Sequence, residues 1–480
     1  MMIRPMHRKF KTLSLAAVLS AAAFSSFGFS MLGPYDSWQV ERIGYNVGSD
    51  IGGPMNLGEE YRWNIKTVYY GYDQSFLQYF GNEGVNAAER AFAMLNALPP
   101  VSQMSSNLTE FPLDTRRQNP TAAALNLVDI GTVTLQFTLE HLGLAEPERY
   151  TWTLRSRVTL SNPSRTNYAV IKRNFDPVTL TPSSFVNGTL YTYVIIDPET
   201  PQIADAVELQ VDPLQFGYTA VASYSAFSGD YYTGLTRDDV GGLRHLYGNA
   251  YPLEHWHVET LPLGTTGAGT GSSGGSPWDP VGGGGFTLGS FVDQAIRPGV
   301  DKVNFVRGQY DSIIGSFIAI TNVWTDTYIS NGVARSQSVQ RAIIAPDIVL
   351  QVEDLGIDPE GIPIFATRTD TAPGINNDAI NGSSQQAGPG VIQGPAIFSF
   401  SSVGPYYFNQ NPFSLDEYSS IPGLVWGSFD GTTNPPVVFP VGTSIQQYQQ
   451  QVIYGGFGAD GSPWTIPNSF IIITNTPDAQ

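Results

Sequence analysis

The chain has 480 residues, of which 41% are hydrophobic and 12% aromatic, so it can bury sizeable cores and is not expected to be disordered. Its formal net charge of −18 argues against nucleic acid or an anionic membrane as a partner, because phosphates would be repelled. The chain contains no cysteine, which excludes disulfide bonds and thiolate chemistry. The length predicts two or three domains.

Residues 1–30 are typical of a secretory signal peptide. A basic segment that ends at Lys11 precedes the apolar run LSLAAVLSAAAF, and small residues near Gly28 and Ser30 offer a cleavage site. The apolar run is short for a membrane span, and no later segment reaches spanning length. We therefore expect a secreted protein (periplasmic, extracellular or on the cell surface) with no membrane span after signal cleavage. Export without disulfides favours a bacterial secretion route.

Residues 61–98 are predicted to form a strand followed by a helix. The strand-like segment is YRWNIKTVYYGY, and the helix is NEGVNAAERAFAMLNALPP, which Pro99 stops. In the helix, Val85, Ala88, Phe92 and Leu95 share one face.

Two more helices are predicted in the first half. DIGTVTLQFTLEHLGL is apolar at helical spacing, although its threonines weaken the pattern, and TGLTRDDVGGLRHLYG runs from Thr233 to Gly248. The stretch between them, at about 150–224, is rich in strand-forming residues.

A Gly- and Ser-rich stretch marks the clearest boundary in the chain. Its composition cannot form a packed core, so residues 251–285 are expected to be a linker. Residues 286–480 alternate β-branched or aromatic runs with Gly, Pro and Asn turns, which predicts a mostly β, sandwich-like domain. The expected fold class is α+β.

The segment that follows Thr233 carries strong helix signals. Thr236 is a good N-cap, and Asp239 lies at the capping-box spacing. Asp238 and Asp239 complement the helix dipole in the first turn. Gly241 and Gly242 each cost about 1 kcal/mol relative to alanine in a helix interior, so this helix is expected to pack tightly against the helix that contains Phe92.

GLTRDDVGGLRHLYG is similar to the final helix of the matrixin branch of the metzincin metalloproteases, and residues 61–98 look like the start of that fold. The resemblance covers at most residues 61–248 and implies a matrixin-like domain over 31–250, with a β-rich insertion at about 150–224. It also implies a zinc helix. We align Gly143 of QFTLEHLGLAE with the glycine of the family motif. The resemblance then sets Gln136, Glu140 and Glu146 at the three zinc-ligand positions. It sets Phe137 at the position of the general base.

These substitutions are incompatible with the family's chemistry. Such a zinc site uses three neutral imidazoles and a water, and a glutamate removes the proton of that water. Phe137 cannot accept a proton, and no methionine follows Met104 to form the family's Met-turn. The resemblance therefore implies a catalytically inactive relative with no cofactor. We expect it to serve as an extracellular or cell-surface binding or structural component whose partner is a protein or a polysaccharide.

The alternative is an active secreted hydrolase. It would use an unusual metal site at Gln136, Glu140 and Glu146, or an unrecognised carboxylate pair of the kind that glycosidases employ. Zinc bound at stoichiometric amounts in the N-terminal half would favour this alternative.

Other candidate sites are weaker. His141 is expected to be exposed or to cap its helix, and His255 and His257 share a strand face near Glu254 and Glu259 that could bind a metal, although a polar linker strand explains them as well. The acidic turn that contains Asp354, Asp358 and Glu360 could bind calcium weakly.

Overall fold

The structure is a computed structural model. It describes residues 27–34, 52–161, 164–197, 204–214, 219–223, 228–248, 257–259, 261, 265–268, 292, 295–311, 316–330, 332–356, 364–371, 391–402, 407–409, 418–420, 425–432 and 435–443. Helices and strands are both abundant and the strands form several small sheets, so the chain is of the α+β class. Among these residues, no helix combines the length and apolarity needed to cross a membrane.

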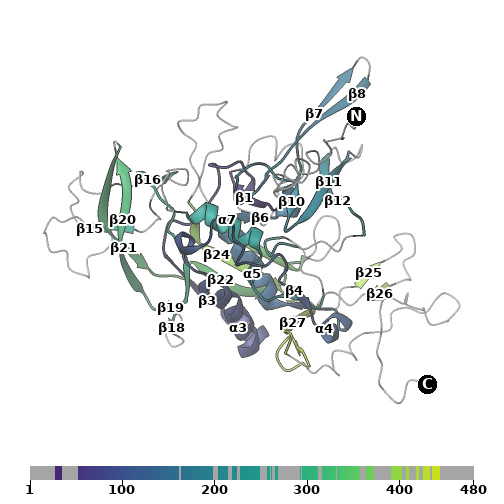
Figure 1. The fold of residues 1–480 in the computed structure, drawn as a ribbon. Helices are drawn as coiled ribbons and strands as arrows, with labels where there is room; N and C mark the ends of the chain where they lie inside the picture. The colour runs from purple at the N-terminus through teal and green to yellow at the C-terminus, as the bar shows by residue number, and fades with distance from the viewer. Residues whose placement is uncertain are drawn as a thin grey trace, which may run out of the picture.

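A five-stranded sheet forms the centre of the molecule (Figure 1). Its order is β17 (Asn304–Arg307), β3 (Thr67–Tyr72), β22 (Ile348–Glu353), β24 (Gln393–Ser401) and β23 (Ala366–Thr371). The first four strands are parallel, and β23 runs antiparallel along the edge beyond β24. A strand was predicted over 61–72, but β3 begins only at Thr67. Trp63 and Ile65, which precede it, are nevertheless buried.

Two neighbouring helices pack on this sheet. Helix α3 (Gln74–Asn96) begins at the N-cap Asp73 and is broken at Gly81, where φ is +55°, a value that glycine adopts without strain. Helix α5 (Ile130–His141) begins at the N-cap Asp129 and is buried along its whole length. An all-round apolar pattern is typical of a buried helix. On β24, the ring of Phe400 lies against both helices and that of Phe398 lies against α5.

Helix α7 (Arg237–Tyr247) confirms the predicted capping box, in which Thr236 and Asp239 bond reciprocally. It packs on a small sheet formed by β1 (Phe29–Gly33), β2 (Gly53–Pro54), β6 (Leu144–Ala145) and β9 (Asn174–Phe175).

The two glycines of α7 face this small sheet and the loop that follows it. A Cβ on Gly242 would lie 2.5 Å from Leu144 Cδ2, and one on Gly241 would lie 2.4 Å from Pro177 Cβ. The expectation that the glycines require contact with α3 was therefore wrong, although close packing does require them.

The buried strand β1 also changes the expected signal boundary. Phe29 and Ser30 are 2% and 1% exposed, and the amide of Gly28 donates to Asp238 over 2.9 Å. A cleavage site near Gly28 or Ser30 would remove part of the core, so the boundary expected at residue 30 has to move to a position before Phe27 if a signal is removed.

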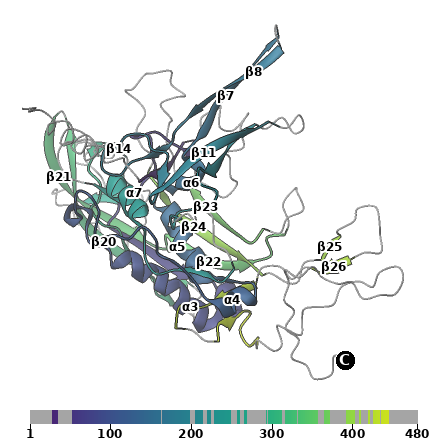
Figure 2. The same cartoon turned by 45° about the vertical axis from the view of Figure 1, so that its right-hand side comes forward.

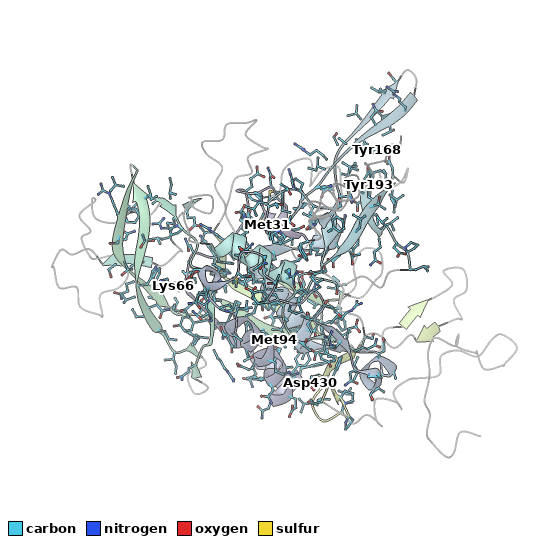
Figure 3. The ribbon with its side chains drawn as sticks, viewed as in Figure 1. Met31, Lys66, Met94, Tyr168, Tyr193 and Asp430 are labelled. Atoms are coloured by element: carbon cyan, nitrogen blue, oxygen red, sulfur yellow. The ribbon has the colours of Figure 1, made fainter. Side chains whose placement is uncertain are left out.

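The predicted insertion forms an arm that projects from the rest of the molecule (Figure 2). It consists of the hairpin β7 (Thr153–Ser161) and β8 (Ser164–Ile171) and of the sheet β10 (Phe185–Val186), β11 (Thr189–Ile196) and β12 (Asp205–Gln210). Tyr168 and Tyr193 lie on this arm (Figure 3).

A second sheet projects on the other side and contains β14 (His257–Glu259), β16 (Ala295–Arg297), β20 (Ile320–Ser330), β21 (Val333–Ile343) and β15 (Thr265–Ala268). The remaining elements are η1 (Val101–Gln103), β4 (Arg116–Gln118), α4 (Pro120–Ala124), β5 (Leu127–Asp129), α6 (Pro147–Tyr150), β13 (Asp230–Tyr232), β18 (Tyr310–Asp311), β19 (Ser316–Phe317), β25 (Tyr407–Asn409), β26 (Tyr418–Ser420), β27 (Val425–Ser428) and β28 (Val437–Val438).

The two halves of the chain share one core. Strand β3 of the first half pairs with β17 and β22 of the second, and β5 pairs in parallel with β27. Every hydrophobic cluster that contains described residues beyond 285 also contains residues from before 250. The expected division into 31–250 and 286–480, with a linker at 251–285, therefore does not separate two cores.

Candidate functional site

Two of the three residues that the resemblance sets at zinc-ligand positions, Gln136 and Glu140, lie on α5 inside the core. Gln136 is 2% exposed and Glu140 is 6% exposed. The amide nitrogen of Gln136 donates to Glu140 Oε1 over 3.4 Å, because positions four apart share a helix face. The structure thus brings these two side chains together, at a buried position.

A cation from the second half of the chain meets this pair. Arg368 lies on the edge strand β23, is 1% exposed and forms a salt bridge with Glu140 Oε2. Its guanidinium also donates to the carbonyl oxygen of Phe137 over 3.4 Å. The negative charge of Glu140 is thereby compensated by a guanidinium from a strand 228 positions away.

Phe137, which the resemblance sets at the general-base position, is part of an aromatic cluster. The Phe137 ring lies 5.6 Å from the ring of Phe398 and 6.3 Å from that of Phe400, and the guanidinium of Arg368 lies 5.9 Å from its centroid. Phe137 fills space between α5 and the central sheet, which explains an aromatic side chain at this position in packing terms.

Glu146 has a different environment, because it is the N-cap residue of the short helix α6 and is partly exposed. Within the described part of the chain, no three His, Asp or Glu side chains are arranged so that they could hold a metal ion.

His141, at the end of α5, is fully buried, so the expectation that it is exposed was wrong. Its ring packs edge-on against Trp63 at 4.9 Å, and the indole nitrogen of Trp63 donates to the His141 carbonyl oxygen over 3.0 Å. The pattern of the sequence contains no sign of this contact, because Trp63 comes from the segment before β3.

The acidic first turn of α7 anchors three segments. Asp238 accepts from the amides of Gly28 and Asn187, and Asp239 accepts from the amides of Val221 and Ala222 over 3.0 Å and 2.9 Å. Burial raises the pKa of both carboxyls. The two aspartates therefore organise distant backbone segments.

The remaining candidates are not assembled into a site. Glu259 is buried in an ion pair with Arg62, and His257 lies opposite Arg297 in the β14–β16 ladder. Asp354 accepts from the amide of Gly356 in its own turn. The other members of these candidate sites, His255, Glu254, Asp358 and Glu360, lie outside the described residues.

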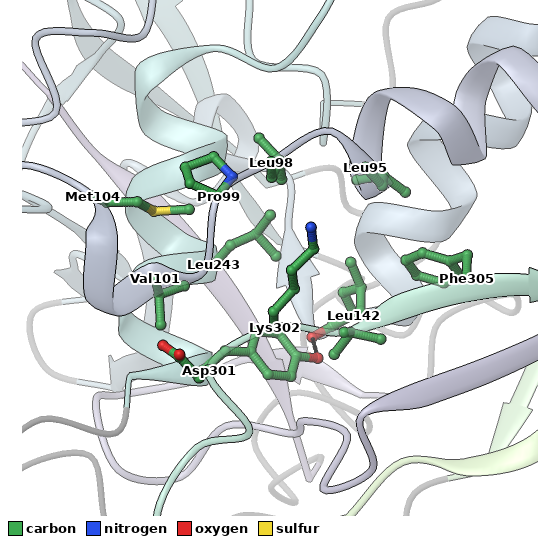
Figure 4. Close-up of a pocket in the computed structure, with 12 residues that line it drawn as sticks. Leu95, Leu98, Pro99, Val101, Met104, Leu142, Leu243, Asp301, Lys302 and Phe305 are labelled. Carbon is green, nitrogen blue, oxygen red and sulfur yellow. Dashed lines mark hydrogen bonds between the residues drawn. The ribbon is translucent and has the colours of Figure 1, made fainter.

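A small apolar cavity of about 40 Å³ lies where the ends of α3 and α7 meet (Figure 4). Leu95 of α3 and Leu98, just after that helix, line it together with Leu243 and Tyr247 of α7. The C-terminal part of α7 does approach the helix that contains Phe92, but the space holds about one water molecule.

A larger cavity of about 390 Å³ lies between α3, the first turn of α5, β13 and the loop after β27. Met94 and Asp430, which both line it, lie on the same side of the molecule (Figure 3). Its polar lining includes Arg90, Asp129 and Thr132. The sequence could not indicate this cavity, because its walls come from four separate segments of the chain.

Comparison with models of known protein families, with curated proteins and with solved structures found no match.

Proposed function

We propose that the protein is a secreted, non-catalytic matrixin-like protein that acts as an extracellular or cell-surface binding component. The observation that carries this proposal is the buried ion pair between Glu140 and Arg368. A guanidinium repels a divalent cation, so a metal at this position would have to displace Arg368 from the core.

The environment of the neighbouring positions supports the same proposal. Gln136 is a poor zinc ligand and already donates to Glu140, while Phe137 offers no base to remove a proton from water. Removal of a general base alone typically costs a factor of about 10²–10⁴ in rate. Helix α7 has a complete capping box. This is expected if a matrixin-like scaffold is retained for its packing after the zinc ligands are lost.

The test is a peptidase assay on the purified protein with gelatin and a generic fluorogenic peptide, with added zinc and with a chelator. We expect no hydrolysis under any condition and less than one zinc ion per chain by elemental analysis. Chelator-sensitive cleavage by the wild type would contradict the proposal and favour the active-hydrolase alternative.

A reverted variant tests the alignment with the zinc helix. Changes to histidine at Gln136, Glu140 and Glu146, combined with Phe137→Glu, restore the ligands and the base of the family motif. Because Arg368 faces position 140, the variant also needs Arg368→Gln. We expect this five-site variant to bind zinc, whereas Phe137→Glu alone should not. A folded five-site variant that takes up no zinc would show that α5 is not a decayed zinc helix.

A further inference from the structure

The cavity beside the N-terminus of α5 has the size and the lining of a small-molecule site. Its volume of about 390 Å³ lies in the range of ligand pockets, about 300–1,000 Å³. The floor is buried, since Ala87, Ala91 and Leu135 are at most 2% exposed. Thr233, Gly431 and Thr432 at the rim are exposed, so the cavity opens to solvent.

Small residues on the two helices create this space. Ala87 on α3 faces Gly131 on α5, where a Cβ would lie 2.9 Å from the Ala87 carbonyl oxygen, and Ala91 lines the same space. The helices approach closely at this glycine, and the short side chains of the alanines leave the neighbouring volume empty.

Opposite charges converge on the cavity. The half-buried guanidinium of Arg90 lines it and donates to Ser428 Oγ over 3.1 Å. Asp129 and Asp430 line it from other sides. Asp129 is held by the Thr132 amide at 2.7 Å and by the Phe429 amide at 3.2 Å, so its position is fixed. Burial raises the pKa of Asp129, and Arg90 partly offsets that effect.

This combination disfavours charged ligands. An anion attracted by Arg90 would be repelled by the carboxyl groups of Asp129 and Asp430, and a cation attracted by those carboxyl groups would be repelled by Arg90, so either charge meets opposing forces. Hydroxyl groups suit both partners, because they donate to carboxylates and accept from a guanidinium. Tyr231 and Phe429 add aromatic surface, with their rings 6.3 Å apart and nearly perpendicular.

We propose that this cavity binds a neutral sugar unit, held by hydrogen bonds to Arg90 and Asp430 and packed against Tyr231 and Phe429. This inference rests on the proposed binding role and names the ligand class for it. The threonines of the lining, Thr132, Thr233 and Thr432, add short hydroxyl side chains around the same space.

The test uses saturation-transfer difference NMR on the full-length secreted protein. The probes are glucose, galactose, mannose, N-acetylglucosamine and their β-linked disaccharides, with glucuronate and glucosamine as charged counterparts. We expect at least one neutral sugar to bind, and to bind more tightly than either charged sugar.

Two variants locate the site. Arg90→Gln removes a charged hydrogen bond and should weaken binding about tenfold or more. Thr233→Trp places a large ring at the exposed rim and should abolish binding. Arg307→Gln is the matched control, because that arginine side chain is 51% exposed on β17 and does not line the cavity. It should leave binding unchanged.

The proposal is overturned if no neutral sugar binds, if a charged sugar binds more tightly, or if the variants at Arg90 and Thr233 bind like the wild type. Circular dichroism checks that each variant is folded. If Thr233→Trp does not fold, the binding result for Arg90→Gln alone decides the test. Failure of sugar binding leaves the peptidase result unaffected, so this inference and the proposed function can fail separately.

Discussion

Buried ion pairs join charged residues of this chain that lie between 6 and 228 positions apart in sequence. Arg62 pairs with Glu259, Arg297 with Asp326, Arg341 with Asp347 and Arg368 with Glu140, and in each pair both side chains are at most 10% exposed. Such pairs add little net stability compared with apolar residues, but the loss of one partner leaves a buried charge without compensation. A single substitution at one of these positions is therefore expected to lower the stability of the folded protein markedly, although few of its residues are charged.

The pair on α5 offers the clearest test of this sensitivity. Arg368→Met leaves Glu140 charged in the core, so we expect the free energy of unfolding to fall by about 3–5 kcal/mol. The measurement is urea denaturation followed by fluorescence. The double variant Glu140→Gln with Arg368→Met removes the charge and should recover part of the loss. Equal stability of the single variant and the wild type would show that the pair is not buried in solution.

Glu148 on α6 gives the protein a pH-dependent stability. Its carboxylate end is buried although the residue is partly exposed overall, and burial raises its pKa to about 8, with smaller contributions from Asp239 and Glu208. In the unfolded chain the pKa is close to 4.5. A raised pKa means that the folded state prefers the protonated form, so stability from this group is complete below about 4.5 and is lost as the pH rises through about 8.

The matched variant is Glu148→Gln, whose amide oxygen can still accept from the Ala220 amide. We expect the wild type to lose stability relative to this variant between pH 5 and pH 9, as measured by urea midpoints at several pH values. A difference between the two proteins that does not change with pH would contradict the raised pKa. Other titrating groups are common to both proteins and cancel in the comparison.

At the scale of elements, the sequence predicted the helices better than it predicted the elements that pack against them. Thr236 with Asp239 and the Pro99 stop are local signals, and α7 and α3 follow them. The element that packs against α7 was predicted wrongly. Gly241 and Gly242 indicate that another element approaches the helix closely, but they do not identify that element. Gln136 and Glu140 lie in a segment that was predicted to be helical and is helical, whereas Arg368, which compensates Glu140, could not be found from any local pattern.

The contact between α7 and the small sheet leads to a prediction for Gly242. Its Cβ would lie 2.5 Å from Leu144 Cδ2 and 3.2 Å from Phe29 Cβ, so Gly242→Ala should cost about 1–3 kcal/mol through overpacking and Gly242→Leu should cost more. Gly234→Ala is the control, because no atom lies within 4 Å of its Cβ position. Thermal unfolding of the three variants measures the difference. A melting temperature for Gly242→Ala as high as that of the control would show that α7 does not pack on β1 and β6.

At the scale of the whole molecule, strand pairing between the halves decides the architecture. The composition of residues 251–285 predicted a linker, but β14 and β15 lie within this range and Glu259 and Leu261 are buried. Composition also carries no information about strand pairing across such a segment. Strand β3 pairs in parallel with β17 and β22, although more than 200 residues separate β3 from either strand. Such a separation is compatible with parallel pairing, because parallel strands are joined by long crossover connections. An alternating pattern in the second half is compatible with a separate sandwich as well as with strands that complete another sheet.

The shared sheet predicts that the first half cannot fold alone. A fragment of residues 27–261 lacks four of the five central strands, which exposes Phe76 and Phe137 where they contact Phe398 and Phe400. We expect this fragment to show no cooperative thermal transition and to bind a hydrophobic dye. As a control, full-length protein with a protease site inserted in the Gly-rich stretch near residue 275 can be cut after folding. The two pieces should then remain associated through the central sheet and unfold together, because the cut leaves every described strand pair intact. A fragment that unfolds cooperatively, with wild-type near-ultraviolet circular dichroism, would show that the first half has a core of its own and that the central sheet does not depend on strands from both halves.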